Sequence, residues 1–244
     1  MIKIENYEVM GWEHAIRGMR NPMNSWERMD SIDCRAQRDT CNGCQYADNN
    51  DTDEMCPGNQ YYLGNTNMCG FIGPNDQELM EKLAKGGPVH AKYRRMITVY
   101  VDITAPLYFW KEFDTYKVGT VANSCSTMHK IHAKEFTLDD FSHEHLFNDE
   151  ELQTNTDVLQ FVIDALNFAR DSYIETKDKT YWWQMIQLLP SSYNQKRTVM
   201  LNYEVLANMY KWRRAHKLDE WVRFCEWIEN LPHSWIITGE KNEH

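Results

Sequence analysis

The sequence predicts an α+β fold, in which strands come early in the chain and helices dominate the later part. The early evidence is Arg95–Ile103, where apolar and polar residues alternate and β-branched residues are frequent, a pattern typical of a strand. The later evidence is a series of segments after Asp157 with apolar residues at helical spacing. The chain has 244 residues, 42% of them hydrophobic, which is enough for one sizeable core, so we expect 1–244 to form a single domain.

Helix boundaries follow from breakers and periodicity. Trp12–Met19 has the spacing of a short amphipathic helix, and Asp76–Lys85 reads as a helix that ends at Gly86 and Gly87. Pro106–Trp110 begins a further extended or helical piece, and Leu138–His145 is compatible with a short helix.

The later part of the chain is expected to be mostly helical. The four predicted helices are Asp157–Thr176, Tyr181–Leu189, Met200–Arg214 and Leu218–Leu231. In the first of them, helical spacing places one group of apolar residues on a common face: Val158, Phe161, Val162, Ala165, Leu166 and Ala169.

The segment Asp30–Asn75 differs from the rest and reads as a long irregular insertion. It is poor in aliphatic residues and contains five of the seven cysteines. Thiolates can tie down a loop that lacks its own core by binding one metal ion. The predicted ligands of a structural zinc or iron–sulfur site are Cys34, Cys41, Cys44 and Cys56. Because this spacing is not a standard finger, reduced thiols without a metal remain the alternative.

Charge and hydropathy exclude several classes of protein. The formal net charge of −10 argues against a broad nucleic-acid-binding face. No apolar run is long enough to span a bilayer, and residues 1–8 lack the apolar core of a secretory signal, so we expect a cytoplasmic protein without direct membrane contact. The glycine patterns of a Rossmann dinucleotide site and of a P-loop are absent from the sequence.

Two polar segments stand out as candidate binding regions. The first, Pro106–His129, places cations before a run of small polar residues, which suits recognition of phosphates and amides. The second, Leu188–Asp219, contains Asn202 and Arg213. If both lay on the predicted helix they would share one face, with Asn208 pointing elsewhere. Such a face would need partners for its polar groups, and a ligand could supply them.

Together these segments resemble the flavin-dependent thymidylate synthases (ThyX). Pro190, Asn202, Leu206, Asn208 and Arg213 reproduce the family's L-P, Asn, Leu, Asn and Arg spacing without a gap. Upstream, Ala105-Pro106 leads to Lys111-Glu112 at the family's R-Q and to Thr115-Tyr116-Lys117 at its RHR motif. The sequence is also similar to a variant subgroup found in phage and prophage genomes of Gram-positive bacteria.

The resemblance implies a small, mainly antiparallel sheet flanked by helices, with a helical C-terminal half. The implied activity is reductive methylation of dUMP to dTMP, with methylenetetrahydrofolate as carbon donor and FAD reduced by NADPH, in a homotetramer. Arg213 would contact and polarise the pyrimidine as the catalytic residue. The implied flavin-binding residues are Lys117, Thr120, Asn202 and Asn208. The implied substrate-binding residues are Lys111, Glu112, Asn123, Ser124, Cys125, Ser126, Gln187 and Arg213.

The sequence departs from the family pattern at charged positions. Thr115 and Tyr116 replace two residues of the RHR motif, and Glu112 stands where the family has Gln. The family's Arg before the L-P is Ile186, beside Gln187. Two alternatives therefore stay open: a related flavoenzyme such as a pyrimidine-nucleotide hydroxymethylase, or a catalytically silent binding protein on the same fold.

Overall fold

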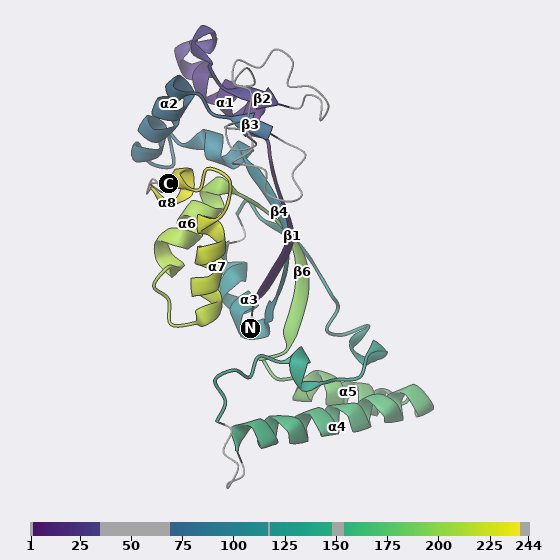
Figure 1. The fold of residues 1–244 in the computed structure, drawn as a ribbon. Coiled ribbons are helices and arrows are strands. Elements are labelled where there is room, and N and C mark those ends of the chain that lie inside the picture. Colours follow the sequence, from purple (N-terminus) through teal and green to yellow (C-terminus); the bar gives the residue numbers. More distant parts are fainter. Residues whose placement is uncertain (1, 35–68, 117, 148–153, 240–244) are drawn as a thin grey trace, which may run out of the picture.

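The computed structural model describes residues 2–34, 69–116, 118–147 and 154–239 (Figure 1). The strands are β1 (Lys3–Met10), β2 (Ile32–Cys34), β3 (Cys69–Phe71), β4 (Thr98–Pro106), β5 (Val121–Ser124) and β6 (Asn194–Asn202). The α-helices are α1 (Trp12–Arg20), α2 (Pro74–Lys85), α3 (Leu107–Phe113), α4 (Asn155–Thr176), α5 (Lys179–Leu188), α6 (Tyr203–Arg213), α7 (Asp219–Glu229) and α8 (Trp235–Thr238). Short 3-10 helices are η1 (Asn21–Met23), η2 (Trp26–Arg28), η4 (Lys92–Met96), η5 (Asp114–Tyr116), η6 (Ile131–Ala133) and η7 (Leu138–Asp140).

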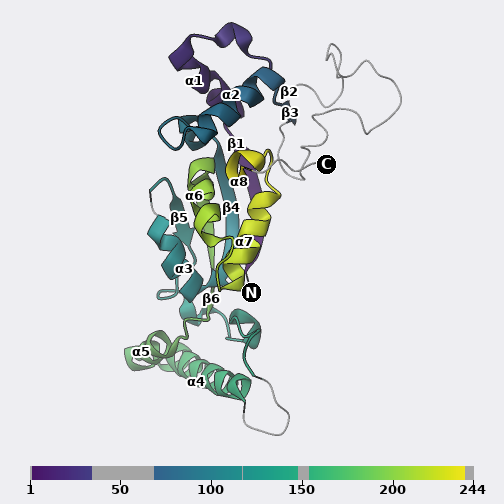
Figure 2. The ribbon, with the colours of Figure 1, turned by 90° about the vertical axis from the view of Figure 1, so that its left-hand side faces the viewer.

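A four-stranded antiparallel sheet in the order β1-β4-β6-β5 forms the centre of the molecule. The helices α3, α6, α7 and α8 lie on one side of this sheet, α1 and α2 lie at one end, and the α4–α5 hairpin lies at the other (Figures 1 and 2). The predicted α+β class, with a small antiparallel sheet flanked by helices, is confirmed. No helix in the described ranges is both long and apolar enough to cross a membrane.

The alternation predicted for the central strand sorts its side chains between the two faces of the sheet. Val99, Val101 and Ile103 are buried in the main core, whereas Asp102 lies on the opposite face. The Asp102 carboxylate accepts hydrogen bonds from Thr198 Oγ1 (2.6 Å) and Asn6 Nδ2 (3.1 Å). These hydrogen bonds lower the pKa of Asp102 to about 2, so the carboxylate is charged at neutral pH.

The expected helix Met200–Arg214 is wrong in its first turn. Asn194–Asn202 is a strand that pairs with β4 over its whole length, from Thr98↔Asn202 to Pro106↔Asn194, and the helix begins only at Tyr203. The buried Val199 and Leu201 show the period-two alternation of a strand. The apolar residues of α6 follow directly, with no break between the two patterns, so the helical pattern was extended backwards into the strand. The strands β1 and β5 were not anticipated either.

The α4–α5 hairpin has a core of its own, separate from the main one. Its centre contains buried Ile163, Leu166 and Met185. A capping box between Thr154 and Asp157 begins α4 two residues before the predicted start. The expected common face of this helix is only partly buried, because Val158 is 52% and Phe161 is 73% exposed. Phe168, which was not part of that predicted face, is 69% exposed.

The remaining predicted helices are present with shifted limits. The segments expected at Trp12–Met19, Asp76–Lys85, Tyr181–Leu189 and Leu218–Leu231 are α1, α2, α5 and α7, and Pro106–Trp110 leads into α3. Of Leu138–His145, the part Leu138–Asp140 forms η7.

A buried ion pair joins α1 to α2 at the base of the Cys-rich segment. The carboxylate of Asp76 accepts hydrogen bonds from Arg20 Nε (2.7 Å), from the backbone N–H of Ser31 (2.9 Å) and from Ser31 Oγ (2.6 Å). Both Arg20 and Asp76 are buried. Asp30 in turn accepts hydrogen bonds from the N–H groups of Asn75 (2.9 Å) and Asp76 (3.0 Å), which caps the first turn of α2.

Candidate functional site

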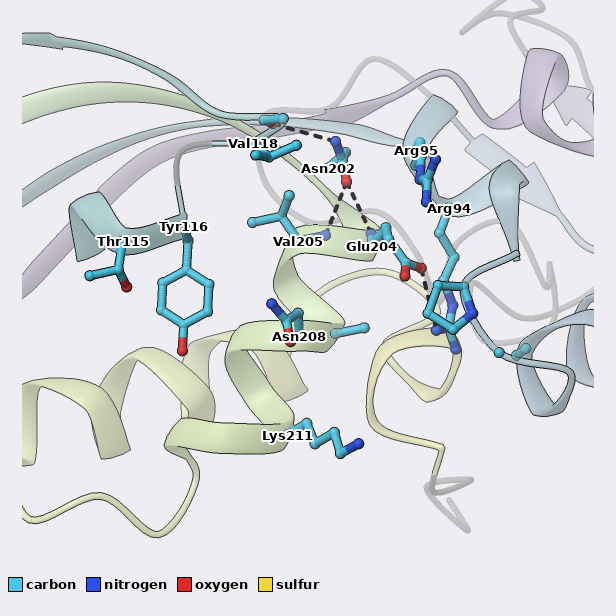
Figure 3. A pocket seen from close by; sticks show the side chains of 15 residues that line it. Arg94, Arg95, Thr115, Tyr116, Val118, Asn202, Glu204, Val205, Asn208 and Lys211 are labelled. Atoms are coloured by element: carbon cyan, nitrogen blue, oxygen red, sulfur yellow. Dashed lines mark hydrogen bonds and ion pairs between the residues drawn. The ribbon is translucent and has the colours of Figure 1, made fainter. Parts of the chain in front are cut away.

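A cavity of about 810 Å³ opens at the beginning of α6 (Figure 3). Its walls come from α6 and its N-cap, from the end of α2, η4 and the turn between them, and from η5 and the segment that joins it to β5. The described residues that line it are Ala84, Gly87, Pro88, Arg94, Arg95, Thr115, Tyr116, Val118, Gly119, Asn202, Glu204, Val205, Ala207, Asn208 and Lys211. Segments more than a hundred residues apart in the sequence therefore meet at one site.

Two of the predicted flavin-binding residues, Asn202 and Asn208, line this cavity together. The expectation that Asn202 shares a helix face with Arg213 is wrong, because Asn202 has an extended backbone (φ −139°) and precedes the helix as its N-cap. Its Oδ1 accepts hydrogen bonds from the N–H groups of Glu204 (3.1 Å) and Val205 (3.0 Å). The chain direction changes at this cap, so Asn202 and Asn208 face the same space.

Gly119 makes the close approach between the η5–β5 segment and α6 possible. Its carbonyl accepts a hydrogen bond from Asn202 Nδ2 (3.4 Å), and its φ of +85° lies in the left-handed region. A Cβ at this position would lie 3.0 Å from Asn202 Nδ2 and 3.2 Å from Val205 Cγ2. A side chain at position 119 would therefore push this wall of the cavity away from the cap.

Arg213, the predicted catalytic residue, is held by α3 and α7 and is not among the residues that line the cavity. Its Nη1 donates to Glu112 Oε2 (2.7 Å) and its Nε donates to the hydroxyl of Tyr116 (3.0 Å). The guanidinium lies 4.9 Å from the centroid of the Trp221 ring. Trp221 Nε1 also donates to Glu112 Oε2 (3.0 Å), so the Glu112 carboxylate is paired rather than open to an anion.

The predicted nucleotide-binding run lies at the opposite end of the β5–β6 pair. Asn123 pairs with Thr198 and Ser124 pairs with Arg197, and both residues are exposed. The backbone N–H of Cys125 donates to Lys196 O (2.9 Å), while its carbonyl accepts a hydrogen bond from Gln195 Nε2 (2.7 Å).

The Ser126 hydroxyl closes the turn that follows β5. It accepts hydrogen bonds from the N–H groups of Met128 (3.2 Å) and His129 (2.9 Å). The run therefore forms one exposed polar edge, with Ser124 beside Arg197 in the sheet register.

Arg197 is a cation at this edge that the sequence analysis did not single out. Its guanidinium lies 4.2 Å from the centroid of the Trp110 ring, and its Nη1 donates to Asp114 Oδ1 (2.8 Å). Its position on a strand was not anticipated, because the residues that follow it were predicted to form a helix.

The remaining predicted residues are dispersed. Lys111 on α3 and Gln187 on α5 are exposed, and neither lines the cavity. Thr120 donates to the carbonyl of Tyr116 (3.3 Å) just outside the cavity wall. Lys117 lies outside the described residues.

The proposed metal ligands fall mostly outside the described part of the chain. Cys34 is the last residue of β2 and pairs in register with Cys69, whereas Cys41, Cys44 and Cys56 lie in the range 35–68, which the structure does not describe. Within the described ranges, no group of three or more His, Cys, Asp or Glu side chains is placed to hold a metal ion. The metal site stays a prediction.

Three cations that line the cavity, Arg94, Arg95 and Lys211, were missed. They come from η4 and from the third turn of α6, and none belongs to the motif positions of the resemblance. The available signal was the pair Arg94-Arg95 at the start of the predicted strand, together with the i, i+3 spacing of Asn208 and Lys211 on one helix face.

The fold of the chain is similar to that of two solved structures. The chain superposes on a crystal structure of thymidylate synthase X (ThyX) from Helicobacter pylori with FAD and dUMP, with a TM-score of 0.60, 14% sequence identity and 98% of each chain covered. A second structure of the flavin-dependent thymidylate synthase ThyX from the same organism, complexed with FAD and dUMP, gives a TM-score of 0.58 at 14% identity, again over 98% of each chain. No protein-family model and no curated protein matches the sequence. The chain therefore has the fold of the flavin-dependent thymidylate synthases.

Proposed function

We propose that this chain is a cytoplasmic flavoenzyme that binds FAD in the cavity at the start of α6 and methylates dUMP to dTMP. Methylenetetrahydrofolate would supply the carbon, and NADPH would supply the reducing equivalents. The observation that carries this proposal is the meeting of Asn202 and Asn208 in one cavity of about 810 Å³. These are the two amides that the resemblance assigns to the flavin, and the fold is that of proteins solved with FAD and dUMP.

The lining residues are compatible with a flavin. The volume lies within the range of about 300–1,000 Å³ that is usual for sites of drug-sized ligands and cofactors. Val205 and Ala207 provide apolar surface beside the amide of Asn208, which has no hydrogen-bond partner within the described part of the chain. The Asn202 amide is already committed to its helix cap, so Asn208 is the amide that a ligand would engage first.

Reduced flavin supplies hydride when it is bound, and the chain must then place and polarise the pyrimidine. Arg213 is the proposed polarising residue, and its guanidinium is paired with Glu112. An anionic nucleotide would have to share or replace that contact, because a guanidinium with two anionic partners divides its hydrogen bonds between them. The exposed edge Asn123–Ser126 is the proposed contact for the nucleotide phosphate.

Flavin binding is the first test. Purified protein should show the visible absorbance of a flavin or acquire it when FAD is added. Asn208→Leu should weaken FAD binding by about tenfold or more, since it removes a hydrogen-bonding group inside the cavity. The matched control, Asn155→Leu on exposed α4, should bind FAD like the unaltered protein. Colourless protein that takes up no added FAD would overturn the proposal.

Activity separates the synthase from its alternatives. Formation of dTMP from dUMP, methylenetetrahydrofolate and NADPH, and growth of a thymidine-requiring bacterium, are the expected results. The Arg213–Glu112 ion pair favours a second candidate, a related pyrimidine-nucleotide hydroxymethylase with altered chemistry, since the proposed catalytic arginine is engaged in the fold. Flavin binding with a hydroxymethylated product instead of dTMP would establish that candidate. Flavin binding without any product would leave a binding protein on the same fold.

We also propose that the chain assembles into a homotetramer. Phe161 and Phe168 are separated by two helical turns on α4, and both are more than two-thirds exposed. The strand β5 is exposed along its whole length, including Val121 at 61%. Apolar surface of this kind is typical of an interface.

Sedimentation analysis tests the assembly. The unaltered chain should sediment as a tetramer, and Phe161→Ser with Phe168→Ser should shift it to smaller species. Glu175→Ser, an exposed substitution on the same helix, should leave the tetramer intact. A monomeric unaltered chain at micromolar concentration would refute the assembly.

A further inference from the structure

The cavity has a cationic side and a neutral side. Figure 3 shows Arg94, Arg95 and Lys211 toward one side of the space and Thr115 and Tyr116 toward the other. Thr115 and Tyr116 occupy positions where the resemblance expects motif residues that bind the flavin. The positive charge of the cavity wall therefore comes from η4 and α6 instead.

The charges of the wall do not cancel. Arg94 lies 3.7 Å from Glu204, and their side chains are 12% and 16% exposed, so these two charges largely offset one another. Three cations and one carboxylate line the cavity among the described residues, which leaves a surplus of two positive charges. The remaining two belong to Arg95 and Lys211, neither of which has an acidic partner within ion-pair distance in the described ranges.

The surplus of two positive charges on the cavity wall is unusual, because the formal net charge of the chain is −10. The summed field of an acidic protein repels anions from its surface, so two cations on the wall of one cavity mark a local exception. Arg95 offers a planar fork that can bind two phosphate oxygens at once, and Lys211 offers a compact point charge. Both line the same cavity, so together they suit a ligand that carries more than one negative charge.

We infer that Arg95 and Lys211 bind the diphosphate of the ligand in this cavity, and that its ring system lies toward Tyr116 and Asn208. The inference rests on the proposed flavin site and names the side chains that hold the charged middle of FAD. The same two cations would bind a free diphosphate, because the recognised chemistry is that of the phosphate oxygens.

Calorimetric titration with three probes tests the inference: FAD, riboflavin, which has the ring without phosphate, and inorganic pyrophosphate, which has phosphate without the ring. Arg95→Gln and Lys211→Gln should each weaken binding of FAD and of pyrophosphate by about tenfold, as expected for loss of a charged hydrogen bond. Both substitutions should also reduce the dependence of affinity on salt, while riboflavin binding stays unchanged. Arg95→Lys should recover part of the loss.

Two matched controls accompany these variants. Lys92→Gln removes an exposed cation from the same 3-10 helix as Arg95, and Lys217→Gln removes an exposed cation just beyond α6. Neither lysine lines the cavity, so both variants should bind all three probes like the unaltered protein. An equal loss in the controls would show a general charge effect and would overturn the inference.

The outcomes separate this inference from the flavin proposal. If FAD binds and its affinity is unchanged by Arg95→Gln and Lys211→Gln, the inference fails and the flavin site stands. If pyrophosphate binds in a manner that depends on both residues while FAD does not bind, the diphosphate site stands and the flavin proposal fails. If neither FAD nor pyrophosphate binds, both fail.

Discussion

Replacing Asp76 by alanine should be among the most destabilising single changes in the described part of the chain. Its side chain is fully buried and accepts hydrogen bonds from Arg20 Nε, the N–H groups of Asp30 and Ser31, and the Ser31 hydroxyl. Removing the carboxylate leaves a buried guanidinium whose other side-chain contact within the described residues is a long hydrogen bond to Ser25 Oγ (3.4 Å). Loss of one partner from a buried ion pair costs about 3–5 kcal/mol of unfolding free energy.

The reverse substitution should cost less. In Arg20→Met the Asp76 carboxylate keeps both backbone donors and the hydroxyl of Ser31, so its charge remains hydrogen-bonded. We expect a loss of about 2–3 kcal/mol, near the value for a single charged hydrogen bond. Against a total stability of about 5–15 kcal/mol for a typical domain, both losses are readily measured.

Urea unfolding followed by tryptophan fluorescence, at one fixed protein concentration, measures both values. Asp139→Ala, which removes an exposed carboxylate, is the control and should change the unfolding free energy by less than about 0.5 kcal/mol. The reasoning is refuted if Asp76→Ala costs less than about 1 kcal/mol, or if Arg20→Met proves the more damaging of the two.

Three further predictions concern the site and its surroundings. Asn202→Ala should lower the unfolding free energy by about 1 kcal/mol through loss of the α6 cap, whereas Asn202→Asp should retain the cap; equal thermal shifts would contradict this. Glu112→Gln should cost about 1–2 kcal/mol in urea unfolding, because Arg213 and Trp221 lose a charged acceptor, and no loss would contradict the observed network. Burial lowers the pKa of His233 to about 4, so the unfolded chain takes up a proton below about pH 6.5 before the folded chain does. The free energy of unfolding should therefore fall as the pH drops from about 6.5 to about 4. His233→Asn, in which the asparagine tolerates the positive φ of 53°, should flatten this part of the plot of unfolding free energy against pH. Equally steep plots for both proteins would contradict the prediction.

The elements that could be predicted are those whose own residues define their limits. Gly86 and Gly87 end α2, and the alternation predicted for Arg95–Ile103 marks β4, which runs from Thr98 to Pro106 because Lys92–Met96 forms η4. The strand β1 escaped because its register shifts between Glu5 and Glu8, which interrupts the simple alternation. Its charged side chains also hide the pattern, since β1 is an edge strand.

From the sequence, residues of the cavity could be singled out only where they belong to one continuous motif. Asn202 and Asn208 were singled out together because their spacing resembles that of a known family, and both line the cavity, while their contact with a flavin stays a prediction. Arg95 was not, because it meets Lys211 only after the sheet and α6 have brought two distant segments together. The pairing of Arg213 with Glu112 was likewise invisible, since helix periodicity describes one segment and not the neighbour against which it packs.

The short ladder between β2 and β3 fixes Ile32–Cys34 against Cys69–Phe71, beside the Asp76 ion pair. The two ends of the intervening stretch are thus anchored by the body of the protein, whatever the stretch contains. Closure entropy grows slowly with length, by about 0.6 kcal/mol for each doubling. A longer or shorter stretch at this place in the chain should therefore change the stability of the fold only slightly.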